Sequence, residues 1–191
     1  MISTFVFVGR PGSGKGTQAK QLAEKRDFAY FATGDWFRAR AKEESPLGAL
    51  VRDTINSGKL MPHWFASYIV QDFVLNQSLE QTLILDGSNR TLPEAKQFDE
   101  YMKWLGRDYR VLSLDVSADE ITKRILGRGQ DSGRADDTEV AIRTRIDEYD
   151  LHTKEAVNYL ESTGAVIHIN GERPIEEISL DIEQLVKELQ S

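Results

Sequence analysis

The stretch FVFVGRPGSGKGTQAKQL, from Phe5 to Leu22, decides the fold class of this chain. It begins with four consecutive apolar residues, as is typical of a strand buried on both faces. Positions Gly9 to Lys15 then read G-x-x-x-x-G-K, and an amphipathic helix pattern follows. Such a loop turns backbone N–H groups and the positive end of the helix toward an anion, and Lys15 adds a cation. The stretch therefore predicts a phosphate-binding loop; a strand-to-helix turn with incidental glycines is the alternative.

The same alternation of apolar runs and helical patterns continues along the chain. Predicted strands lie at 5–8, 29–31, 82–85, 111–116 and 166–169, and predicted helices at 15–26, 118–127, 138–162 and 174–190. Near-continuous apolar strands that alternate with helices favour a parallel sheet covered on both faces. We therefore expect a doubly wound, five-stranded α/β fold. The long interval 34–76 is expected to form a small helical subdomain.

Composition excludes several classes of protein. The 191 residues, 40% of them hydrophobic, suffice for one domain with a sizeable core. A net charge of -7 argues against binding nucleic acid over the whole surface. The absence of Cys rules out disulfides and a Cys-type zinc site, and no run of about 18 apolar residues predicts a membrane span. Met1 leads directly into a strand, so a cytoplasmic protein is expected.

A second motif is ATGDWFRARA, residues 32–41. Thr33 and Asp35 are both candidates for the N-cap of a helix, and Arg38 lies about one turn further on. A hydroxyl and a guanidinium on one helical turn suit a second anion. Trp36 and Phe37 are expected to pack in the core rather than stack on a base.

A third motif is LILDGSNRTLPEA, residues 83–95, in which an apolar strand ends at Asp86. This places the Asp86 carboxylate at the carboxyl edge of the sheet, where it can anchor magnesium through water. Arg90 follows within reach of the same crevice. In the first motif Gly16 stands where Ser or Thr usually ligates magnesium, so Thr17 is the alternative direct ligand. A simple turn at Asp86 is the competing interpretation.

A Gly-rich, charged stretch, RGQDSGRADD at 128–137, separates two predicted helices and is typical of a lid. Several guanidiniums around such a loop suit a polyphosphate whose charge must be stabilised during transfer. A solvated loop with surface ion pairs to Asp131, Asp136 and Asp137 is the alternative. The arginines concerned are Arg124, Arg128, Arg134 and Arg145.

Together these motifs resemble the nucleoside monophosphate kinases, and the short-lid adenylate kinases most closely. The matching pieces are GRPGSGKGTQA, TGDWFR, GKL at 58–60, DGSNRT and SGRADD with Arg145, in the family's order. The resemblance implies a P-loop NTPase fold with a core of 1–32, 63–127 and 138–191. It also implies a monophosphate-binding insert at about 33–62 and a short lid at about 128–137.

The resemblance also implies roles for individual residues. ATP phosphates would meet Gly12, Ser13, Gly14, Lys15, Gly16 and Thr17, and the ATP site would also include Arg124, Arg128 and Arg173. The monophosphate would meet Thr33, Gly34, Arg38, Lys59, Leu60, Met61, Gly87, Arg90 and Glu94, with Arg134 and Arg145. Lys15, Arg90, Arg128, Arg134 and Arg145 would act on the transferring phosphoryl group, and Asp86 would hold Mg²⁺ through water.

The resemblance further implies reversible, magnesium-dependent transfer of the ATP γ-phosphoryl group to a monophosphate. The expected partners are ATP and that acceptor, without zinc, nucleic acid or membrane, and the expected state is a monomer. AMP is the leading acceptor. A kinase for GMP or a pyrimidine monophosphate and a weakly catalytic nucleotide-binding module are the alternatives.

The chain departs from the family at three positions of the third motif. Ser88 and Asn89 stand where the family has Phe and a proline that is typically cis. A cis bond before a residue other than proline is costly, so a trans path for the Arg90 loop is an alternative. Glu94 stands where adenylate kinases have Gln, whose amide both donates and accepts, whereas an ionised carboxylate only accepts. Glu94 therefore favours the two adjacent donors of guanine over adenine, whereas Thr33 favours adenine.

Overall fold

The computed structural model describes residues 1–128 and 138–191, and the side chains of all of these except 125–128. One five-stranded sheet has the order β2-β3-β1-β4-β5, and every neighbouring pair is parallel. The expected doubly wound α/β fold is confirmed. The strands are β1 (Thr4–Gly9), β2 (Ala29–Ala32), β3 (Leu83–Asp86), β4 (Tyr109–Asp115) and β5 (Val166–Asn170).

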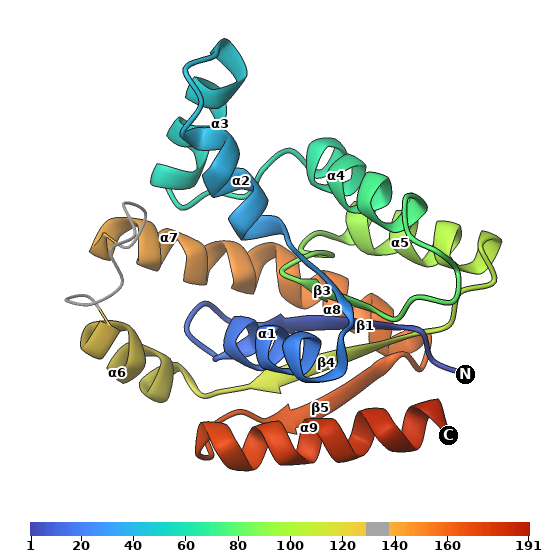
Figure 1. The fold of residues 1–191 in the computed structure, drawn as a ribbon. Coiled ribbons are helices and arrows are strands. Elements are labelled where there is room, and N and C mark those ends of the chain that lie inside the picture. The colour runs from blue at the N-terminus through green and yellow to red at the C-terminus, as the bar shows by residue number, and fades with distance from the viewer. Residues whose placement is uncertain (129–137) are drawn as a thin grey trace.

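Helices cover both faces of the sheet (Figure 1). Phe5 and Phe7 of β1 pack on one side with residues of α1 (Lys15–Arg26) and α9 (Ile175–Gln190), and Val6 and Val8 pack on the other. Because both sets of side chains are buried, the strand reads as a continuous apolar run. Burying one such side chain contributes about 1.5–3 kcal/mol. The second face is covered by α4 (His63–Leu75), α5 (Leu92–Trp104) and α8 (Lys154–Ser162).

Two helices extend beyond the sheet at the top of Figure 1, α2 (Thr33–Ala41) and α3 (Pro46–Asn56). The prediction of a Thr33 or Asp35 N-cap is wrong: Ala32 is the N-cap of α2, and no side chain caps it. The reason is that the Thr33 hydroxyl donates its hydrogen bond to the carbonyl oxygen of Gly87, which follows β3. Phe37 is buried, which confirms its predicted packing role.

The helix predicted over 138–162 is three segments. An α-helix, α7 (Glu139–Glu148), runs into a π-helical turn, η1 (Tyr149–Thr153), and then into α8. A π turn inserts one residue relative to α-helical spacing and so redirects the side chains that follow. Before this segment, α6 (Ala118–Arg128) ends at the last described residue before the gap. The expected lid at 128–137 lies outside the described residues except for Arg128.

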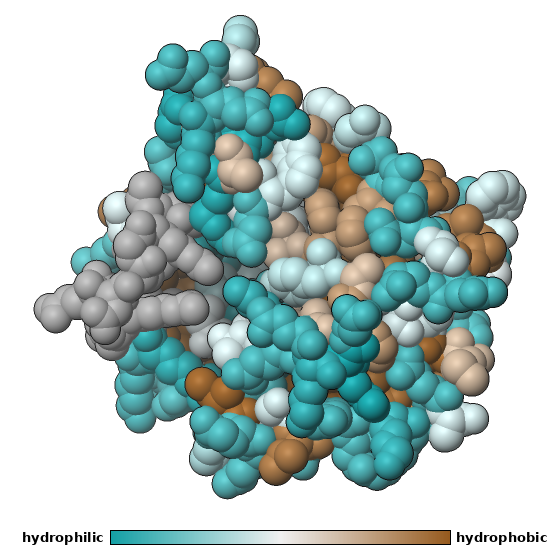
Figure 2. Space-filling view, in the orientation of Figure 1, coloured by the Kyte–Doolittle hydropathy of each residue, from teal (hydrophilic) through white to brown (hydrophobic). Residues whose placement is uncertain are grey.

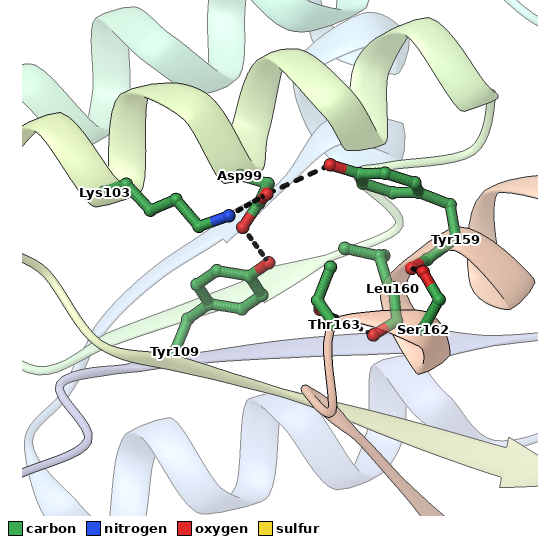
Figure 3. Close-up of polar contacts among 7 residues, drawn as sticks. All are labelled: Asp99, Lys103, Tyr109, Tyr159, Leu160, Ser162 and Thr163. Atoms are coloured by element: carbon green, nitrogen blue, oxygen red, sulfur yellow. Dashed lines mark hydrogen bonds and ion pairs between the residues drawn. The ribbon is translucent and has the colours of Figure 1, made fainter.

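A buried carboxylate joins the helical layer to the sheet and to α8 (Figure 3). Asp99 of α5 accepts hydrogen bonds from the Tyr109 hydroxyl at 2.9 Å, the Tyr159 hydroxyl at 3.0 Å and Lys103 at 2.6 Å. Burial opposes ionisation of Asp99, but these donors outweigh it and lower the pKa of the carboxyl. The network satisfies the charge and fixes α5 against its neighbours.

The visible surface is mainly polar. Figure 2 shows hydrophilic side chains over most of the face formed by α1, α2 and α3, with hydrophobic side chains beside α4. Trp64 and Tyr68 of α4 are 65% and 60% exposed. Among the described residues, no helix combines the length and the apolar character needed to cross a bilayer.

Candidate active site

The site lies at the carboxyl ends of β1, β2 and β3. Asp86, the last residue of β3, pairs in register with Phe7 of β1 and with Ala32 of β2. The loop after β1, the first turn of α2 and the loop after β3 therefore start at one sheet edge, where open α/β folds bind ligands. A cavity of about 560 Å³ lies between them.

Most of the residues predicted for the site line this one cavity. They come from four segments that are far apart in the sequence, which the parallel sheet brings to one edge. These residues are Gly12, Gly14, Lys15, Gly16, Thr17, Thr33, Gly34, Arg38, Asp86, Gly87, Arg90 and Arg145.

The phosphate loop has the backbone geometry that its glycines allow. Gly14 is the N-cap of α1 with φ of 89°, and Gly12 has φ of 85°. Both angles lie in the left-handed region that side chains disfavour. No side chain caps α1, so the N–H groups of its first turn remain available for an anion.

Asp86 lines the cavity, and one of its carboxylate oxygens, Oδ1, is buried. Its Oδ1 atom has no hydrogen-bond partner among the described residues, and Oδ2 accepts from the Tyr30 hydroxyl at 3.5 Å. Burial raises the pKa of Asp86, and Lys15 offsets only part of that effect. A carboxylate in the wall of this polar cavity fits an anchor for a hydrated magnesium ion. In the part of the chain whose side chains are described, no three His, Asp or Glu residues group closely enough to hold a metal by themselves.

A smaller cavity of about 90 Å³ adjoins the first. Glu94 lies in its wall, and its carboxylate accepts from the Arg90 N–H at 3.0 Å and the Thr91 hydroxyl at 2.9 Å. The two cavities share Thr33, Gly34, Arg38, Gly87, Arg90 and Arg145. Lys59, Leu60, Met61 and Glu94 line only the smaller one.

Known proteins are similar to this chain over most of its length. The family model of adenylate kinase matches residues 7–165. An adenylate kinase of Synechococcus sp. (strain JA-2-3B'a(2-13)) is 36% identical over 184 residues, which cover 95% of each chain. One of Pseudarthrobacter chlorophenolicus is 33% identical over 191 residues, the whole of both chains, and one of Bacteroides fragilis is 36% identical over 183 residues, 95% of this chain and 96% of that one.

The chain belongs to the adenylate kinase family. It is accordingly a phosphotransferase of the nucleoside monophosphate kinase type. The charges of the larger cavity suit such an enzyme. Three acidic groups, Glu24, Asp35 and Asp86, line it beside a larger cationic set in a protein of net charge -7. The cationic set is Lys15, Lys20, Arg38, Arg90 and Arg145.

Three residues assigned to the ATP site lie outside the two cavities of this adenylate kinase family member. Ser13 is buried beneath the loop. Arg124 donates to the Ser13 carbonyl oxygen at 3.4 Å and to Glu120 at 2.9 Å. Arg173 pairs with Asp181 of α9 at 2.5 Å. The side chain of Arg128 and the whole of Arg134 lie outside the described residues.

The structure adds residues to the family site that the sequence reasoning missed. Tyr30 lines the larger cavity beside Asp86, and Asp35 pairs there with Arg38. Tyr30 lies near the end of a predicted strand, and this position could have indicated a place at the ligand-binding edge of the sheet. Glu148 of α7 accepts from the Leu60 N–H at 3.4 Å, and nothing in the local sequence of either residue indicates that contact.

Proposed function

We propose that this chain transfers the γ-phosphoryl group of ATP reversibly to a nucleoside monophosphate, with AMP as the principal acceptor and Mg²⁺ as cofactor. The observation that carries the proposal is the continuity of the two cavities. The larger begins at the phosphate loop, and the smaller ends in a pocket at Lys59, Met61 and Glu94. A donor at the loop and an acceptor in the pocket would meet at Arg38, Arg90 and Arg145, which line both.

These residues position and stabilise the reacting groups. The backbone of the phosphate loop and Lys15 hold the outer phosphates of ATP, and Arg38 binds the phosphate of the acceptor. Arg90 and Arg145 stabilise the charge on the phosphoryl group in transit. An acceptor phosphate oxygen is the nucleophile. It is anionic at neutral pH, so no general base is required.

Asp86 would hold magnesium through water, with Thr17 as a second candidate ligand. Bound with ATP, magnesium would supply positive charge that offsets the charge developing on the transferring group. The position of Asp86 in the wall of the larger cavity, with Oδ2 beside Gly16 of the phosphate loop, supports this assignment.

The domain roles are part of the same proposal. Residues 33–62, which include α2 and α3, would form the acceptor-binding insert, and 128–137 would form the lid. Closure of both would exclude water and protect ATP from hydrolysis. A monomer in the cytoplasm stays a prediction.

Glu94 is the feature that speaks for another acceptor, because a carboxylate matches the donors of guanine better than adenine. Its two oxygens, however, accept from the chain's own Arg90 N–H and Thr91 hydroxyl. Because the Glu94 carboxylate is hydrogen-bonded to its own loop, it does not prevent adenine from binding. The names of the relatives also favour AMP.

The test is a transfer assay with ATP and Mg²⁺ against AMP, GMP, CMP, UMP and dAMP in parallel, in which each diphosphate is measured directly. Predominant ADP from AMP is expected. Lys15→Met should abolish product while Lys187→Met, on the exposed face of α9, leaves it unchanged. Preference for another monophosphate would overturn the choice of acceptor. No product with any acceptor, despite ATP binding, would identify a binding module.

A further inference from the structure

The loop that carries Arg90 is held in an unusual way. It contains no proline between Gly87 and Arg90, and Asn89 has φ of 57°, in the left-handed region. No peptide bond among the described residues is cis, so the chain takes a trans path through Ser88 and Asn89. Since no proline fixes the backbone here, the conformation of this buried loop depends on contacts with its surroundings.

One contact holds the amino side of Arg90. The Arg90 N–H donates to Glu94 Oε2 at 3.0 Å, and the Thr91 hydroxyl donates to Oε1 at 2.9 Å. Thr91 is also the N-cap of α5, which makes Thr91 and Glu94 a capping pair. Glu94 is only 5% exposed, so both oxygens serve the loop from a buried position.

A second contact holds the carbonyl side. The Thr153 hydroxyl donates to the Arg90 carbonyl oxygen at 3.0 Å. Thr153 is the last residue of the π-helical turn and is 3% exposed. The turn is itself tied to the phosphate loop, because Arg10 pairs with Asp150 at 2.9 Å. Pi turns of this kind occur often at functional sites.

We propose that Glu94 and Thr153 are positioning residues that clamp the Arg90 main chain from both sides and so aim its guanidinium at the transferring phosphoryl group. This rests on the proposed function. A displacement near 1 Å at such a group costs up to about 100-fold in rate. The clamp takes over the role that a rigid loop would have. It also gives Glu94 a task other than reading the acceptor base.

A positioning role and a base-reading role of Glu94 predict different results for conservative variants. In Glu94→Gln the amide oxygen can still accept from Arg90, and the amide NH₂ can donate to the Thr91 hydroxyl. A positioning role therefore tolerates Gln. Glu94→Met keeps the length and loses both hydrogen bonds. A base-reading role instead responds to Gln with a change of acceptor.

The experiment measures kcat and KM for ATP and for AMP, GMP and CMP in the full-length chain, with thermal melting alongside. We expect Glu94→Met and Thr153→Val each to lower kcat about 10- to 100-fold for every acceptor in equal proportion. KM should stay within about twofold. Thr153→Ser, which keeps the hydroxyl, and Glu94→Gln, which keeps an acceptor for the Arg90 backbone N–H, should each recover most of the kcat that the Val and Met variants lose. The double variant should lose little more than the worse single variant, because both displace one loop.

The matched control is Thr163→Val. The Thr163 hydroxyl donates to the Leu160 carbonyl oxygen at 2.7 Å, beyond the other end of α8 and outside both cavities. Because Thr163 is exposed, this variant should leave kcat unchanged, and the melting curves show how much of the Thr153→Val effect is loss of stability. If Glu94→Met does not fold, the Thr153→Val and Thr153→Ser pair decides the question.

Three results would overturn the clamp: wild-type kcat in Thr153→Val, an equal loss in Thr163→Val, or a tenfold or larger change of acceptor preference in Glu94→Gln. Each requires an active wild type. An inactive wild type would instead refute the proposed function, and the clamp with it.

Discussion

The Thr33 hydroxyl donates to the Gly87 carbonyl oxygen at 2.7 Å, which joins the first turn of α2 to the loop after β3. The two residues are 54 positions apart, yet they follow adjacent strands, β2 and β3. The bond sets the wall shared by both cavities, from which Arg38 and Arg90 reach the same space.

Arg90→Ala should lower kcat by about 10²- to 10³-fold, because the guanidinium stabilises charge that exists only in the transition state. Steady-state assay of diphosphate formation measures the effect. Arg110→Ala is the control, since Arg110 lies on β4, outside both cavities, and among the described residues its guanidinium donates to the neighbouring Tyr109 carbonyl oxygen. A loss of less than tenfold for Arg90→Ala would remove it from the reaction.

Asp86→Asn should raise the Mg²⁺ concentration for half-maximal activity by about 10- to 100-fold, because the neutral amide holds the hydration shell of the ion less well. Titration of activity with Mg²⁺ at fixed ATP measures the shift. Asp108→Asn, at an exposed carboxylate, is the control. An unchanged magnesium titration would mean that the Asp86 carboxylate does not anchor the ion.

Gly58→Ala should raise the KM of the acceptor by roughly tenfold with little effect on that of ATP. A Cβ on Gly58 would lie 2.3 Å from the Ala141 carbonyl oxygen of α7, so the neighbouring Lys59 backbone must shift. Gly106→Ala is a matched control. Gly106 also has positive φ, but a Cβ there meets nothing within 4 Å. Equal effects in both variants would trace the loss to backbone strain alone.

Asp99→Asn should lower the free energy of unfolding by about 1–3 kcal/mol, because charge-assisted hydrogen bonds inside the fold are lost. Since the folded pKa of Asp99 is lowered, its contribution is complete above the unfolded pKa of about 3.9. It disappears as pH falls through the folded value. Urea unfolding at pH 7 and pH 3 should show the difference between wild type and variant narrowing at the lower pH. A difference independent of pH would contradict the assignment.

His168 should stabilise the fold at low pH rather than at high pH, which is the opposite of Asp99, and His168→Gln should remove that contribution. The Asp115 carboxylate at 2.7 Å, with Glu161 at 2.8 Å, raises the pKa of His168. The stabilisation from protonated His168 is therefore full below the unfolded pKa of about 6.5 and is lost as pH rises through the folded value. Thermal melting from pH 5.5 to 9 should show wild type losing its advantage over His168→Gln. His152→Gln is the control, and parallel profiles for wild type and His168→Gln would refute the prediction.

Much of the fold was predictable from the sequence because its signals are local. The run at Phe5 to Val8 is apolar at every position since β1 is buried on both faces. The glycines of the phosphate loop indicate a backbone with positive φ, and Gly12 and Gly14 both have positive φ in the structure. The N-cap at Thr33 failed as a prediction, because a tertiary hydrogen bond to the backbone after β3 outweighed a local preference. The π turn that interrupts the predicted helix 138–162 could not be predicted either, because one inserted residue barely alters the spacing of apolar residues along the helix.

The sequence by itself determined the succession of strands and helices along the chain, the phosphate loop and the set of arginines available for chemistry. Only the tertiary structure decided which of them meet. Arg38, Arg90 and Arg145 share two cavities, whereas Arg173 pairs with Asp181 away from both. Thr153 reaches the Arg90 carbonyl oxygen across 63 positions of sequence. Such contacts depend on sheet register and on the rotation of packed helices, which no local pattern of residues specifies.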